Sequence, residues 1–140
     1  MISSQFENQI NEMIIDDEIS NPCYKYTFQT LGYHTIIFMM NLNTNSLNSM
    51  FSNVYNMTSI IFNKYFNTEN ITNMGYMFSR CYKLTSIDIS NFDTKNVVYM
   101  DYMFFFCEDL TSLEISNFQT TKVTNMEAMF CECSLPIYNF

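Results

Sequence analysis

Residues 74–99 read MGYMFSRCYKLTSIDISNFDTKNVVY, and residues 100–125 read MDYMFFFCEDLTSLEISNFQTTKVTN. The two segments align without a gap, and a third copy opens at Met126 with MEAMFCEC. Four series of identical residues therefore recur every 26 positions: Met74, Met100 and Met126; Met77, Met103 and Met129; Phe78, Phe104 and Phe130; Cys81, Cys107 and Cys133. This repetition predicts a fold built by stacking copies of one structural unit.

The repeat continues upstream in a less regular form. Phe66 keeps the 26-residue spacing to the later copies, although one extra residue stands near Lys64. Residues 42–47 resemble a degenerate first copy, and the last copy breaks off after Cys133 in SLPIYNF. We therefore expect about three to four stacked coils that end in a partial coil.

The middle of each copy has the apolar pattern of a short strand. The apolar residues of this part are Leu84, Ile87 and Ile89. Ile87 and Ile89 lie two positions apart, which is the period of a strand with one buried face. We predict parallel strands centred near Ile60, Ile87 and Leu113. The predicted buried side chains are Leu84, Ile87, Ile89, Met100, Met103 and Phe104.

The opening residues of each copy have the apolar pattern of a helix. Met100, Met103, Phe104 and Cys107 lie at i, i+3, i+4 and i+7, which places four apolar side chains on one helical stripe. One strand and one short helix cannot bury their apolar faces alone, so the coils must stack. The predicted fold is a right-handed α/β solenoid with parallel strands on one face and short helices on the other.

The sequence predicts two parts. Residues 41–140 form the repeat array. Residues 1–40 form an atypical capping segment, which begins with an amphipathic helix because Phe6, Ile10, Met13 and Ile14 lie at i, i+4, i+7 and i+8. Residues 24–40, with the run Ile36-Ile37-Phe38-Met39-Met40, are expected to add atypical strands.

Composition excludes several classes of function. The chain has 140 residues, 48% of them hydrophobic, so a buried core rather than disorder is expected. Six Lys and Arg residues against fourteen Asp and Glu residues give a net charge of -8, which disfavours nucleic-acid binding. The sequence contains neither the pattern of a signal peptide nor an apolar run long enough to span a membrane. It therefore predicts neither export nor membrane insertion.

The repeat resembles that of a known family. The string C-x-x-L-T-S-I-D-I-S-N-F-D-T-K-N-V at residues 81–97, followed by M-x-x-M-F at residues 100–104, is similar to the repeat of BspA-like leucine-rich-repeat surface proteins. The resemblance covers roughly residues 41–140. It implies a leucine-rich-repeat-like solenoid at a cell surface or secreted, which attaches to a protein or another host or cell-surface ligand. Since the sequence itself predicts no export, a cytoplasmic location stays open.

Two outward surfaces are candidates for binding. The strand face carries Ser86 and Asp88, and the next copy carries Ser112 and Glu114 at the same positions. Paired carboxylates also occur in glycosidases and calcium sites, but a smooth solenoid face and the lack of a calcium-loop pattern favour a solvated acidic ladder.

The second candidate is an aromatic edge. Helical spacing leaves Tyr102, Phe105 and Phe106 pointing sideways or out, with Tyr76 in line with Tyr102 one coil earlier. An exposed aromatic patch is typical of an interaction site. The alternative, that Phe105 and Phe106 pack against an adjacent helix or turn, stays open.

The cysteines and the single histidine do not predict catalysis or a cofactor. The five cysteines are Cys23, Cys81, Cys107, Cys131 and Cys133. An odd number cannot pair fully within one chain, and the ladder at Cys81 is interpreted as small buried side chains. Cys131 and Cys133 offer two thiols, but with His34 as the only histidine the ligands for a zinc site are too few, and His34 is interpreted as a structural or surface residue and not as the base of a cysteine nucleophile.

The sequence therefore predicts a non-catalytic interaction or adhesion module without metal or cofactor. The alternative is a structural protein that self-assembles into a homo-oligomer through its C-terminal coil, where an incompletely covered edge can pair with another copy. An enzyme is the third class, and the residues do not supply a nucleophile, a base and an orienting group together.

Overall fold

The computed structural model describes residues 3–16, 18–20, 36–40, 42–62 and 65–136. The chain divides into two compact units, Met1–Asn43 and Thr44–Phe140. Each unit has its own sheet.

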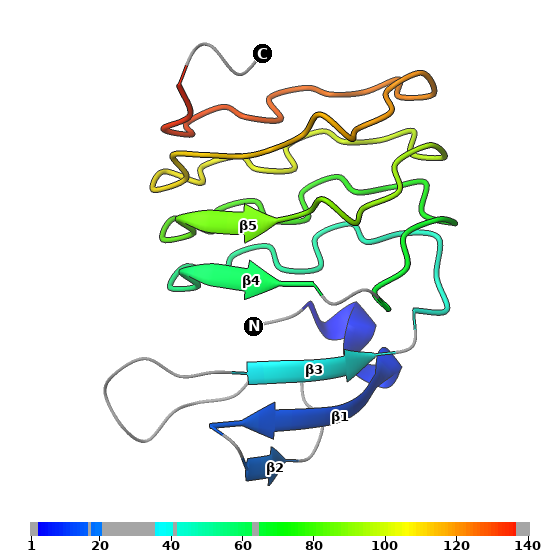
Figure 1. Ribbon diagram of the computed structural model, residues 1–140, viewed down its shortest axis with the longest axis vertical. Helices are drawn as coiled ribbons and strands as arrows, with labels where there is room; N and C mark the ends of the chain where they lie inside the picture. The colour runs from blue at the N-terminus through cyan, green and yellow to red at the C-terminus, as the bar shows by residue number, and fades with distance from the viewer. Residues whose placement is uncertain (1–2, 17, 21–35, 41, 63–64, 137–140) are drawn as a thin grey trace. The chain divides into compact units, whose positions relative to one another are not determined.

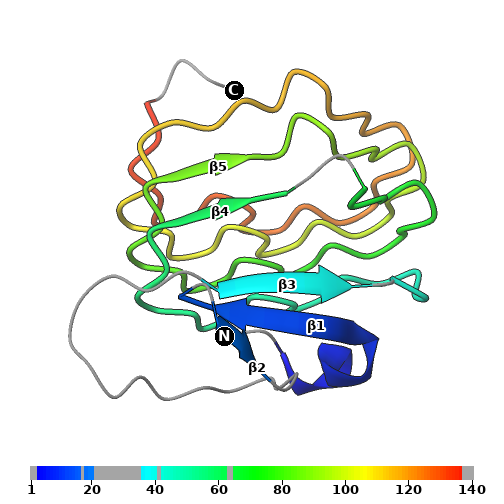
Figure 2. The ribbon, with the colours of Figure 1, turned by 60° about the horizontal axis from the view of Figure 1, so that its bottom comes forward.

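The first unit is a small antiparallel sheet. A 3-10 helix, η1 (Ser4–Gln9), precedes β1 (Ile10–Ile15), and β2 (Glu18–Ser20) and β3 (Ile36–Met40) follow. β1 is the central strand of the order β2-β1-β3 and pairs antiparallel with both neighbours (Figure 2).

The amphipathic helix predicted for residues 6–14 is wrong, because most of that segment is strand β1. Met13 and Ile15 are buried while Ile14 between them is half-buried, so the buried side chains follow the two-residue period of a strand. Pairing with Ile37 on one side and Ile19 on the other decides this conformation. β3 confirms a strand within residues 24–40, whereas residues 24–35 lie outside the described part of the chain.

The second unit contains the repeats. β4 (Ser59–Ile61) and β5 (Ser86–Asp88) pair in parallel with Ile60 opposite Ile87, as predicted (Figure 1). The strand predicted near Leu113 is not formed. None of the backbone hydrogen bonds in the described residues joins residues 111–115 to β5, although Leu113 itself is buried.

A second set of parallel contacts fixes the register of the copies. Isolated parallel bridges join Ser46 to Asn73, Asn73 to Tyr99, and Tyr99 to Asn125. These spacings are the repeat length, with one added residue in the first interval. Successive copies therefore lie one above another, as the ribbon shows for this unit (Figure 1).

The predicted helices are also wrong, since the M-x-x-M-F half of each copy consists of turns. In the copy at residues 100–125, Phe105 N donates to Tyr102 O, and Cys107 N donates to Phe104 O. The alternate amides donate to the copy above instead, as Tyr102 N does to Glu127 O and Phe104 N to Met129 O. An α-helix would direct all of these amides to carbonyls four residues earlier in the same segment.

Left-handed residues make these turns possible. Tyr102 has a φ of 55° and Phe106 a φ of 57°, and the equivalent residues of the other copies also have positive φ: Ser49, Asn53, Tyr76, Arg80, Ala128 and Glu132. Tyr76 is the third residue of the turn that the Met77 amide closes on Met74 O, and Phe106 is the third residue of the turn that the Cys107 amide closes on Phe104 O. Two successive turns reproduce the i, i+3, i+4, i+7 spacing of buried side chains, which is why the pattern resembles that of a helix.

The core of the second unit consists of columns of identical side chains. Phe104 stacks on Phe78 at 5.3 Å between ring centroids, and the column continues to Phe51 at 5.7 Å below and Phe130 at 5.9 Å above. Five of the six side chains predicted to be buried are at most 1% exposed: Leu84, Ile89, Met100, Met103 and Phe104. The sixth, Ile87, is half-buried. The inward assignment of the M-x-x-M-F motif is thus confirmed.

The fold class predicted from the sequence is therefore corrected. The described residues contain short parallel and antiparallel strands and one 3-10 helix, but no α-helix. They form a small β-rich protein, not an α/β leucine-rich-repeat solenoid with a helical face. The apolar spacing is compatible with a helix and with successive turns. The backbone hydrogen bonds between the copies select the turns.

Candidate binding surface

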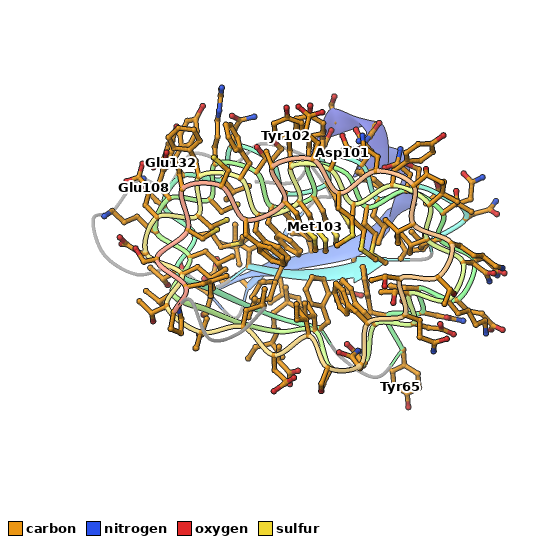
Figure 3. All side chains as sticks on the ribbon, turned by 90° about the horizontal axis from the view of Figure 1, so that it is seen from above. Tyr65, Asp101, Tyr102, Met103, Glu108 and Glu132 are labelled. Carbon is orange, nitrogen blue, oxygen red and sulfur yellow. The ribbon has the colours of Figure 1, made fainter. Side chains whose placement is uncertain are left out.

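The repeats present two outward surfaces. The strand face is formed by residues 58–61, 85–88 and 111–114, and the turn face by residues 48–55, 75–82, 101–108 and 127–132. Figure 3 shows Met103 pointing into the unit, Asp101 and Tyr102 on its outer edge, and Tyr65 on the opposite edge. Each face thus carries a different set of repeated side chains.

The strand face is polar and locally bonded. Ser86, Ser112, Asp88 and Glu114 are all exposed, as predicted from their outward positions. Asp88 accepts hydrogen bonds from the hydroxyl of Ser90 at 2.6 Å and from its amide at 3.0 Å, and Glu114 accepts from the amide of Ser116 at 2.8 Å. These hydrogen bonds lower the pKa of both carboxyl groups.

Because each of these carboxylates is bonded within its own turn, their immediate role is to order the loop that follows the strand. Sequence reasoning missed a different feature of this face. Ile61, at the position of Asp88 one copy earlier, is 86% exposed, and Tyr65 is 79% exposed. The apolar character of both was visible in the sequence, but the register of β4 on β5 was needed to place Ile61 opposite Asp88.

The turn face carries a connected belt of aromatic rings. Tyr76 stacks on Tyr102 at 4.8 Å, as their alignment one copy apart predicts, and Phe105 lies at 82° to Tyr102 with centroids 5.2 Å apart. Phe105 also contacts Phe106 at 4.5 Å. All four predicted aromatic residues are therefore brought together.

Two tyrosines that sequence reasoning missed extend this belt. Tyr82 meets Phe106 at 6.4 Å, and Tyr55 stacks on Tyr82 at 5.4 Å. Tyr55 and Tyr82 are 27 residues apart, which is the spacing of the first interval, so the repeat alone could have indicated the pair. We name the six rings of Tyr55, Tyr76, Tyr82, Tyr102, Phe105 and Phe106 the aromatic belt.

All six rings of the aromatic belt are at the surface. Tyr55 is 50% exposed and Tyr76 37% exposed, and the other four are half-buried. For Phe105 and Phe106 both interpretations of the sequence hold in part, since they pack against neighbouring rings and still reach solvent. The belt is thus ordered by ring contacts and is accessible.

The hydroxyl of Tyr102 is fixed by a carboxylate of the next copy. Tyr102 Oη donates to Glu127 Oε1 at 2.5 Å. This hydrogen bond, with the negative charge of Glu127, raises the pKa of Tyr102 to about 12. Glu127 is exposed, and the spacing of 25 residues gave no sequence signal for it, because only stacking brings the two together.

The surroundings of the belt are acidic. Asp101, Glu108, Asp109, Glu127 and Glu132 all lie in or beside the turn face and are exposed or half-buried. Among the described residues, the cations there are Arg80 and Lys83, and Lys83 forms an ion pair with Asp109 at 3.0 Å. Figure 3 shows Asp101, Glu108 and Glu132 directed outward. Five carboxylates against two cations leave this surface negative.

The cysteine ladder has a structural role, as interpreted from the sequence. Cys81 Sγ donates to Phe51 O at 3.2 Å, Cys107 Sγ to Phe78 O at 3.2 Å, and Cys133 Sγ to Phe104 O at 3.0 Å. Burial raises the pKa of the Cys81 thiol to about 12, and interaction with the Cys133 thiol, followed by burial, raises that of Cys107. Both buried thiols therefore stay protonated and are poor nucleophiles.

Within the described residues, no group of three or more His, Cys, Asp or Glu side chains is arranged to hold a metal ion. Cys23 and His34 lie outside that part of the chain. A search of the same residues finds no helix with the length and hydrophobicity to cross a membrane.

Residues 45–136 match the model of a family described as Mycoplasma protein of unknown function, DUF285. The chain belongs to the DUF285 family. The match starts in the first copy and ends in the last, so the family model describes the repeats that carry both faces. No curated protein sequence and no solved structure gives a match to this DUF285 chain.

Proposed function

We propose that this DUF285 chain is a non-catalytic binding module that recognises another protein through its turn face. The observation that carries the proposal is the aromatic belt, in which six rings form a connected, accessible surface. Aromatic side chains bury much area at little cost in side-chain entropy, and they are enriched where proteins bind one another.

The backbone beneath the belt favours the same function. Tyr76, Tyr102 and Phe106 occupy left-handed positions. The backbone amide of each donates to a carbonyl of the next copy, as Tyr76 N does to Asp101 O. The rings are therefore held in place before a partner arrives. Preordered side chains lose less entropy on binding, which raises affinity.

The proposed location is a cell surface. This part of the proposal rests on the similarity of residues 81–104 to the repeat of BspA-like surface proteins, which implies attachment to a host or neighbouring molecule. Membership of a family of repeat-bearing Mycoplasma proteins is compatible with that location. Fractionation of cells, with an antibody against residues 44–136, tests the location directly.

The binding function is tested by removing apolar side chains from one face at a time. Tyr76→Ser with Phe105→Ser removes two rings from the aromatic belt. Ile61→Ser with Tyr65→Ser is the matched control, because it removes two exposed apolar side chains that lie outside the turn face. Each purified chain is immobilised and exposed to a surface-protein extract, and the captured proteins are quantified by mass spectrometry.

We expect the belt variant to lose captured proteins that the wild type and the control retain. Equal capture by all three chains contradicts the proposal, and loss only in the control assigns binding to the strand face instead. Circular dichroism of each variant establishes that the loss does not come from unfolding.

Self-assembly is the second candidate, and one observation favours it. Met126 is 45% exposed, whereas Met74 and Met100 at the same position of earlier copies are fully buried. Stacking a second chain on the last copy would bury Met126 in the same way that Met74 and Met100 are buried. Light scattering over a dilution series tests this: a dimer that Met126→Glu dissociates supports it, and a monomer at every concentration excludes it.

A further inference from the structure

We propose that the turn face takes an arginine-bearing basic segment, with one guanidinium group stacked on Tyr102 beside Glu127. The inference rests on the proposed binding function and adds the chemical class of the partner. It follows from three features: an interrupted column of rings, a carboxylate at the interruption, and the charge of the surrounding surface.

The column of rings at this position stops at Tyr102. Tyr76 and Tyr102 stack at 4.8 Å with an angle of 12° between their planes. The next copy has Ala128 at the equivalent position, with a φ of 49° that matches the 55° of Tyr102. The backbone path continues, but a methyl group replaces the third ring. Within the described residues, Tyr102 therefore has a stacking partner from the copy below and no ring contact with the copy above.

The neighbouring rings do not take that place. Phe105 comes from the same copy as Tyr102 and meets it at 82°, so it lies beside the column and does not extend it. The phenylalanine column in the core is not interrupted, since Phe104 is stacked on both sides, by Phe78 and Phe130. The interruption is thus specific to the surface column of Tyr76 and Tyr102, where Ala128 takes the next position and is half-buried.

A carboxylate lies at the interruption. Glu127 directly precedes Ala128, and its Oε1 accepts the Tyr102 hydroxyl at 2.5 Å. That bond occupies one oxygen of the carboxylate and fixes it near the ring edge. No ion pair among the described residues neutralises Glu127 or the nearby Asp101. A planar cation on Tyr102 would therefore meet the ring face and a negative charge together.

Arginine fits this arrangement better than lysine does. Its guanidinium group is planar, stacks on aromatic faces and donates in parallel to carboxylate oxygens, whereas the lysine ammonium is a compact and strongly hydrated charge. The acidic surface around the belt, with Glu108 and Glu132 directed outward, attracts further cations of the same segment.

The test uses defined peptides with the full chain. Fluorescence polarisation measures binding of a short labelled peptide that contains two arginines separated by glycine and serine, and of versions with lysine or citrulline in place of arginine. Citrulline keeps the shape of the side chain and removes its charge. The variants are Glu127→Gln, which still accepts the Tyr102 hydroxyl, and Ala128→Tyr, which supplies the missing ring.

Asp88→Asn is the matched control, because it removes one negative charge from the strand face. We expect Glu127→Gln and Ala128→Tyr each to weaken binding of the arginine peptide by about ten-fold, from loss of the charge pair or the stacking surface. The control should change it by less than about two-fold. Lysine should bind more weakly than arginine, and citrulline should not bind.

Three outcomes overturn the inference: equal losses in Asp88→Asn and Glu127→Gln, equal binding of the citrulline and arginine peptides, or no binding by the wild-type chain. These results leave the proposed function standing if the aromatic-belt variant still loses captured proteins in the extract experiment. If both experiments fail, the turn face is not a binding surface.

Discussion

Single buried side chains hold the copies of the repeat together, and Phe104 shows how. It is fully buried, stacks on a phenylalanine of the copy below and another of the copy above, and its carbonyl accepts the thiol of Cys133. Its neighbour Phe105 is half-buried and faces the surface. Adjacent residues of the same type thus have different roles, which stability measurements can separate.

Truncation of Phe104 to Ala should lower the free energy of unfolding by about 3–5 kcal/mol, the range for a buried phenylalanine that leaves a cavity. Phe105→Ala is the matched control and should cost less, since part of that ring remains in solvent. Chemical denaturation of both variants measures the two values. Equal losses would contradict the assignment of Phe104 to the core.

The cysteines should differ in reactivity by position. Cys131 is exposed, whereas Cys81 and Cys107 are buried with raised thiol pKa values. Because the thiolate is the reactive form, iodoacetamide at pH 8 should label Cys131 in the folded chain and leave the other two unmodified. Peptide mass spectrometry reads out each site. In denaturant all three should react, and labelling of Cys81 in the folded chain would show that the ladder opens.

The turn is the element that distinguishes this fold, and its conformation limits which residues it accepts. Two left-handed positions recur in each copy, and large side chains occupy several of them, including Tyr102, Phe106 and Arg80. A left-handed conformation costs an L-residue roughly 1–2 kcal/mol. At Tyr102 and Phe106 the ring contacts of the aromatic belt offset that cost.

Arg80→Gly should therefore stabilise the chain by about 0.5–1 kcal/mol, because glycine adopts a positive φ without the steric penalty and Arg80 is exposed. Glu108→Gly is the comparison, at an exposed position without a positive φ, and should destabilise by a similar amount. Thermal unfolding measures both. A loss of stability in Arg80→Gly would mean that its side chain makes a favourable contact that exceeds the strain.

In the second unit, Thr44–Phe140, stability comes from contacts between neighbouring copies of the repeat. Amides of each turn donate to the copy above. The hydroxyl of Thr68 does the same, to Asp93 O at 3.1 Å, and so does that of Thr94, to Gln119 O at 3.3 Å. The hydroxyls of Thr72, Thr85 and Thr124 donate to the copy below. Each copy thus meets its neighbours through the same set of bonds. Repeats of this kind add stability copy by copy.

Deletion of residues 74–99 removes one copy and places Met100 where Met74 stood. The shortened chain should fold, with lower stability and a smaller dependence of the free energy of unfolding on denaturant, because less surface is buried. Deletion of residues 74–86 removes half a copy and should abolish cooperative unfolding, because every column then loses its register. Circular dichroism during denaturation compares the two chains.

The sequence by itself determined the repeat and its register. Four series of identical residues gave the spacing, and that spacing placed the Phe104 column, the cysteine ladder, the pairing of Ile60 with Ile87 and the alignment of Tyr76 with Tyr102. These features depend only on which side chains recur and face inward, and apolar periodicity reports that directly.

Tertiary structure alone decided the conformation of the backbone between those side chains. The spacing i, i+3, i+4, i+7 is met both by a helix and by two successive turns. This segment forms turns because the amides of Tyr102 and Phe104 donate to the next copy and not to carbonyls of their own segment. The same stacking brings Glu127 to the Tyr102 hydroxyl and joins Tyr82 to Phe106. Hydrogen bonds between copies have no signature in the order of residues within one copy, so they emerge only when the copies are stacked.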